Sequence, residues 1–133
     1  MKIHIIGCSG SGKTYLANAL SKKYNNDEWI IEGVYYAWVQ QFFDEADKIY
    51  VLDMPSYLYK SRIIMRSIKR KLGILKGKKE TLKSVYNLLK WTETFQNKNL
   101  KEIRSILDRY DNKVIWLSRK KDVEKIIKAV CLT

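Results

Sequence analysis

The chain has 133 residues, a formal net charge of +12 at pH 7 and 46% hydrophobic residues, as expected for one globular domain with its own core. No apolar run approaches the ~18 residues of a membrane span, and the N-terminus enters a strand-like segment without the apolar core of a signal peptide. We therefore expect a single cytoplasmic domain over residues 1–133, with no membrane partner.

Four short segments rich in Ile, Val or Tyr have the composition of buried parallel strands, at residues 2–6, 29–32, 48–53 and 113–117. The apolar spacing between them predicts helices over residues 14–24, 35–45, 57–72, 82–89, 100–110 and 123–130. We expect a break at residues 96–99, with Asn99 as the N-cap of the helix that follows. This alternation predicts an α/β fold with a mainly parallel sheet.

A phosphate-binding motif, GxxxxGKT, lies between the first strand and the first helix. Its candidate ligand-binding residues are Gly7, Ser9, Gly10, Ser11, Gly12, Lys13 and Thr14. Glycines let successive backbone N–H groups turn toward a phosphate, and the helix that follows directs its positive dipole end to the same point. Lys13 is expected to reach the β- and γ-phosphates, and the Thr14 hydroxyl to hold Mg²⁺. The motif predicts a P-loop NTPase domain that binds a nucleoside triphosphate.

Polar residues at the carboxyl ends of the strands are further candidates, because ligands of open α/β sheets bind there. Glu32 ends the second strand, Asp53 ends the third, and Arg119 follows the last. A P-loop enzyme needs an acid to orient the waters around Mg²⁺, and both Glu32 and Asp53 fit that role or that of an ordinary strand terminator. Arg119 fits packing on an adenine ring as well as it fits a surface position.

Most of the net charge lies in one segment. From Lys60 to Lys83 there are ten basic residues and one acid, Glu80. Such a segment is typical of a solvated face, of a nucleic-acid patch or of a clamp on phosphates. The helical part lies around residues 57–80, and the family resemblance given below implies that this basic segment is a lid.

Two stripes run along the helix expected over residues 57–72. Arg62, Arg66 and Arg70 recur every four residues on one side, and the apolar positions 64, 68 and 72 fall on roughly the opposite side. We expect the helix to pack through its apolar stripe and to present the guanidinium groups toward solvent or a ligand. Arg62 and Arg66 are the preferred contacts to a transferring phosphoryl group, with a solvated face as the alternative.

Other residues that often carry chemistry favour structural interpretations here. Cys8 and Cys131 are isolated, which does not indicate a disulfide framework or a metal site. His4 lies within the first strand, where we expect a packed, hydrogen-bonded histidine of the core or of the surface and not a catalytic one. Trp91 and Phe95 lie one helical turn apart, and we favour core packing over base stacking.

The chain resembles the bacterial DNA topology modulation protein family, also called FlaR-like. The resemblance rests on residues 7–14, 29–35, 46–55, 73–80 and 89–91 and on the arginine helix. It implies a branch of the adenylate-kinase-like P-loop proteins, with ATP and Mg²⁺ as ligands. It also implies that Glu32 lies near the metal, that Asp53 is mainly structural, and that Arg62 and Arg66 belong to a lid. The family name implies involvement with DNA.

The chain departs from this family after its first helix. The family carries a further strand and helices there, where adenylate kinases bind the phosphate acceptor, whereas residues 23–28 here lead directly into the second strand. We therefore expect a three-layer α/β/α fold whose four-stranded sheet has the order 2-1-3-4.

Three functions remain open from sequence. The first is a kinase-like phosphotransferase acting on a nucleotide or another small molecule, with Lys13, Glu32, Arg62 and Arg66 as catalytic residues. The second is a nucleotide-binding or weakly hydrolysing remnant. The third is a DNA-binding or topology-modulating protein that uses the basic segment at residues 60–83.

Overall fold

A computed structural model of the protein describes residues 1–24, 29–34 and 39–132. The strands are β1 (Ile3–Gly7), β2 (Ile30–Gly33), β3 (Lys48–Leu52) and β4 (Val114–Leu117). The helices are α1 (Lys13–Ser21), α2 (Gln40–Glu45), α3 (Ser56–Lys71), α4 (Leu82–Thr94), η1 (Phe95–Asn99), α5 (Leu100–Leu107), η2 (Asp108–Tyr110) and α6 (Lys120–Leu132). Most of the expected first half of the helix at 35–45 lies outside the described residues.

The four strands form one parallel sheet in the order β2-β1-β3-β4, which confirms the predicted order. The register places Ile3 beside Ile30 on one side and beside Lys48 on the other, and Ile49 beside Val114. All five residues of β1 are buried, as expected for a central strand of a parallel sheet. The predicted strand boundaries agree with the structure to within one residue.

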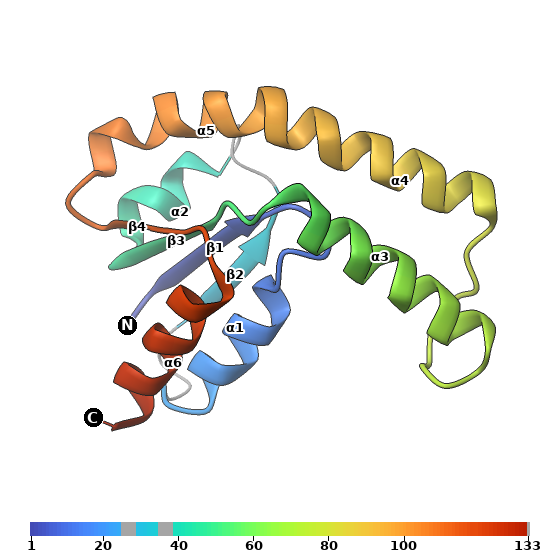
Figure 1. Ribbon diagram of the computed structural model, residues 1–133. Coiled ribbons are helices and arrows are strands. Elements are labelled where there is room, and N and C mark those ends of the chain that lie inside the picture. The colour runs from blue at the N-terminus through green and yellow to red at the C-terminus, as the bar shows by residue number, and fades with distance from the viewer. Residues whose placement is uncertain (25–28, 35–38, 133) are drawn as a thin grey trace.

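Helices cover both faces of the sheet (Figure 1). Helices α1 and α6 lie on one face, while α2 and the long helical run from α4 through α5 lie on the other. The core between these layers is built from Ile, Leu and Val of the strands and from aromatic residues of α2, α3 and η1. No helix of the described residues is both long and apolar enough to cross a membrane.

His4 is a core residue, one of the two placements expected from sequence, and its buried Nδ1 has no hydrogen-bond partner. Its side chain is 1% exposed and packs edge-on against the Phe43 ring, with 4.8 Å between ring centroids. Burial lowers the pKa of His4 to about 4, so the ring is neutral at physiological pH. A neutral imidazole inside the first strand takes no part in the site described below.

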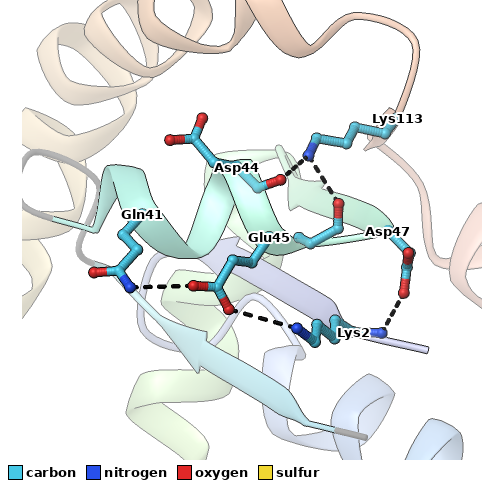
Figure 2. A network of polar contacts seen from close by, with 7 residues as sticks. Lys2, Gln41, Asp44, Glu45, Asp47 and Lys113 are labelled. Atoms are coloured by element: carbon cyan, nitrogen blue, oxygen red, sulfur yellow. Dashed lines mark hydrogen bonds and ion pairs between the residues drawn. The ribbon is translucent and has the colours of Figure 1, made fainter.

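A polar network ties α2 to the amino ends of β1 and β4 (Figure 2). The backbone N–H of Lys2 donates to Asp47 Oδ2 at 2.7 Å. Lys113 Nζ donates to two carbonyls at the end of α2, that of Asp44 at 3.1 Å and that of Ala46 at 2.8 Å. A cation at a helix C-terminus satisfies carbonyls that lack intrahelical partners. The network fixes the amino-terminal end of the sheet, opposite the carboxyl end of β1.

The predicted break at residues 96–99 is wrong. The helix continues from α4 into α5 through a π-helical turn, η1, and the Asn99 side chain makes no capping hydrogen bond. The backbone N–H of Leu100 donates to the carbonyl of Phe95, five residues earlier, so one extra residue is accommodated within the helix. The side chains of Phe95 and Leu100 are both buried, because the wider turn keeps them on the same face of the helix.

The predicted orientation of the arginine helix is also wrong in part. Tyr59 and Ile63 are buried, whereas Ile64, Ile68 and Leu72 are exposed. Helix α3 therefore packs through a face that adjoins its arginines, and its other apolar stripe points away from the protein. Two stripes with the same four-residue spacing do not reveal from sequence which one is covered.

Candidate functional site

A glycine-rich loop, residues 7–14, joins β1 to the N-terminus of α1. Gly10 and Gly12 have positive φ angles of 79° and 100°, and Gly12 immediately precedes α1. A Cβ added to Gly10 would lie 2.7 Å from the Tyr59 carbonyl oxygen, so the loop backbone lies directly against α3. Ser11 is buried, and its Oγ donates to the Cys8 carbonyl at 2.7 Å. The Ser11 side chain thus stabilises the turn to which it belongs.

Lys13 folds back over this loop from the first residue of α1. Its Nζ donates to the Cys8 carbonyl at 2.9 Å. Burial lowers the pKa of Lys13 below its ordinary value, an effect that the Glu32 carboxylate opposes and Arg66 reinforces. The ammonium group therefore lies in a partly desolvated position, where a phosphate would gain strongly from contact with it.

Thr14 and Glu32 are brought together, as the metal hypothesis requires. The Thr14 hydroxyl donates to Glu32 Oε1 at 2.9 Å, which joins the start of α1 to the end of β2. Hydroxyl and carboxylate oxygens are ligands that Mg²⁺ prefers. No cluster of three or more His, Cys, Asp or Glu side chains suited to a metal occurs among the described residues. These residues therefore fit Mg²⁺ only as a partial shell, to be completed by phosphate oxygens and water.

Arg62 and Arg66 reach the loop from α3. Arg62 Nη1 donates to the Gly10 carbonyl at 3.1 Å, and Arg66 Nη2 donates to Ser9 Oγ at 3.3 Å. The Nε atom of Arg66 is buried without a hydrogen-bond partner. A buried donor without a partner is costly, and an incoming anion would satisfy it. The structure thus brings both arginines to the glycine-rich loop, while their contact with a ligand stays a prediction.

A cavity of about 590 Å³ opens at this point. It is lined by Ser9, Gly10, Gly12, Lys13, Thr14, Tyr15, Arg62, Arg66, Lys120 and Glu124. Lys120 and Glu124 come from the first turns of α6 and were missed by the sequence analysis, as was Tyr15. The rule that ligands bind at the carboxyl ends of strands extends to the first turn of the following helix, and that extension identifies Lys120.

Three other residues that the sequence singled out, Asp53, Arg70 and Arg119, do not line this cavity. Asp53 forms an ion pair with Arg104, with 3.2 Å between Nη2 and Oδ2, which agrees with a structural role. Arg119 is exposed and paired with Asp122, with 3.0 Å between Nη2 and Oδ1, and it does not line the cavity. Arg70 pairs with Glu80 at 3.0 Å, farther along α3.

The two cysteines and the pair Trp91 and Phe95 lie outside the cavity. Burial raises the pKa of Cys8 to about 11, so its thiol is neutral and unreactive at physiological pH. Cys131 is exposed at the other end of the chain, and both cysteines are free. Phe95 is buried, which confirms core packing for that residue. Trp91 is 37% exposed, so the prediction of core packing is wrong for Trp91, although its ring lies 5.5 Å from that of Phe95 between centroids.

No family model, no curated protein and no solved structure matches the chain. The function is therefore inferred from the geometry of the site.

Proposed function

We propose that the protein binds ATP·Mg²⁺ at the glycine-rich loop and transfers the γ-phosphoryl group to a small molecule, as a kinase-like phosphotransferase. The observation that carries this proposal is the convergence of three cations, Lys13, Arg62 and Arg66, on one loop at a helix N-terminus. Backbone N–H groups at such a position bind phosphate, and the cations offset its charge.

Each side chain has a separate task in this proposal. Lys13 would exchange the Cys8 carbonyl for the β- and γ-phosphate oxygens, and Arg62 and Arg66 would leave their loop acceptors for the transferring group. Thr14 and Glu32 would hold Mg²⁺, which when bound neutralises charge on the phosphates. Phosphoryl transfer depends mainly on positioning and electrostatics, so these residues suffice without a named general base.

A second candidate function is nucleotide binding with slow hydrolysis. It is favoured by the short connection between α1 and β2, residues 22–29, which leaves little chain for an acceptor-binding segment. In that case water takes the place of the acceptor, and the same cations act on the same phosphates.

Transfer of labelled γ-phosphate tests the proposal. We expect the purified protein to move label from ATP to a nucleoside monophosphate or another small acceptor, and Arg62→Ala to reduce the rate by roughly a thousandfold. Arg109→Ala is the matched control, because Arg109 is exposed and does not line the cavity. Release of labelled phosphate to water alone would select the second candidate. If the folded protein neither transfers labelled phosphate to an acceptor nor releases it to water, both candidate functions are refuted.

A further inference from the structure

The turn between α3 and α4 exposes an unusual set of apolar side chains. We call residues 69–83 the hairpin tip. Its large apolar residues are Leu72, Ile74, Leu75 and Leu82, and all four are exposed, Leu82 at 82% and Ile74 at 71%. Figure 1 shows that the tip lies at one end of the molecule, away from the sheet. Apolar residues gathered on a projecting end indicate a binding surface.

The same tip is densely basic. Lys69, Lys71, Lys76, Lys78, Lys79 and Lys83 are all exposed, and no ion pair joins any of them to an acid among the described residues. The one acid of the tip, Glu80, is paired with Arg70, with 3.0 Å between Oε1 and Nη1. Gly77 packs against the same guanidinium group. The inner pair closes the turn, so the charged side chains left on the outer surface are lysines, beside the apolar groups and the hydroxyl of Thr81.

The chemistry of this surface distinguishes between partners. Nucleic acid would pair with the lysines but would leave Leu72, Ile74 and Leu82 in water. Protein interfaces are enriched in arginine and depleted in lysine, whereas the only arginine of the tip is used internally. An anionic lipid surface fits both features, since apolar side chains enter the interface while long lysine stems carry their charges to the headgroups.

We propose that the hairpin tip attaches the protein peripherally to anionic lipid membranes. Leu72, Ile74 and Leu82 enter the headgroup boundary, and the surrounding lysines contact lipid phosphates. The proposal goes beyond the sequence-based expectation of no membrane partner, which rested on the absence of a long apolar run and so concerned a spanning helix. The inference does not depend on nucleotide binding, because none of the tip residues lines the cavity at the loop.

Vesicle flotation tests this inference on the full chain. We expect the protein to float with mixed vesicles of phosphatidylcholine and phosphatidylglycerol, and not with vesicles of phosphatidylcholine alone. Combining Lys76→Ser, Lys78→Ser and Lys79→Ser should lower the partition coefficient by roughly a hundredfold. Combining Ile74→Ser and Leu82→Ser should lower it by roughly tenfold or more. Both sets lie at exposed positions, so the variants are expected to remain folded.

Matched controls come from α6. Lys121→Ser, Lys125→Ser and Lys128→Ser remove the same charge from another exposed surface, and Leu132→Ser changes a side chain that is 87% exposed. These controls should float with the mixed vesicles nearly as well as the wild type. Absence of flotation, or equal loss in the tip and α6 lysine variants, would overturn the proposal. The proposal would also be overturned if the protein bound duplex DNA through the tip lysines and did not bind vesicles.

Discussion

Thr14 and Glu32 lie 18 residues apart in the sequence, and a hydrogen bond of 2.9 Å joins the Thr14 hydroxyl to Glu32 Oε1. The bond links the first turn of α1 to the carboxyl end of β2, beside the cations of the glycine-rich loop. It distinguishes Glu32 from Asp53, which is held by Arg104 instead. In the proposed function, this hydroxyl and this carboxylate form the protein part of a magnesium site.

Glu32→Gln should weaken binding of ATP in the presence of Mg²⁺ by roughly tenfold, because the amide keeps the shape but not the charge of the ligand. Binding of ATP without the metal should change much less. Isothermal titration with and without Mg²⁺ measures both. Asp53→Asn is the matched variant, and it should lower stability through loss of the Arg104 pair while leaving the metal dependence intact. If Asp53→Asn weakened the Mg²⁺-dependent binding of ATP and Glu32→Gln did not, the metal would be assigned to Asp53.

Gly10→Ala should reduce the free energy of unfolding by about 3 kcal/mol, because it combines an unfavourable φ of 79° with a contact of 2.7 Å to the Tyr59 carbonyl. Gly73→Ala is the matched control. Gly73 has a similar φ of 75° and no atom within 4 Å of an added Cβ, so only about 1 kcal/mol of backbone strain is expected there. Urea unfolding measures both values. Equal losses would show that the loop does not lie tightly against α3.

The buried His4 predicts a specific dependence of stability on pH. Burial lowers its folded pKa to about 4, while the unfolded value is about 6.5, so the unfolded state binds the proton more tightly. This contribution to stability is fully present above the unfolded pKa and falls by about 3 kcal/mol as the pH drops toward the folded pKa. Urea unfolding of the wild type and of His4→Ile from pH 7 to pH 4 isolates it. Parallel pH profiles would contradict the assignment.

Much of the fold follows from sequence because the signals are local. The Ile-rich run of β1 and the glycines that follow it predict both a central strand and the loop at its end, and the strand order confirms this arrangement. The proximity of Glu32 to the loop also follows, because parallel strands end at a common edge of the sheet.

The remaining features depend on packing between elements. Lys120 and Glu124 reach the cavity only because α6 returns beside α1, a contact that has no local signature. The burial of Ile63 in place of Ile64 depends on the close approach of α3 to Gly10. The π-helical turn was missed because a five-residue interval between Phe95 and Leu100 resembles a break in α-helical spacing.

Titration of ATP·Mg²⁺ into the protein, followed by calorimetry and by thermal unfolding, tests the central claim most directly. We expect one site per chain, a raised Tm at saturating nucleotide, and an affinity at least roughly tenfold lower for Lys13→Met, which retains the side-chain stem but not the charge. Absence of binding by the folded wild type, or equal affinity in a folded Lys13→Met variant, would contradict a nucleotide site at the glycine-rich loop.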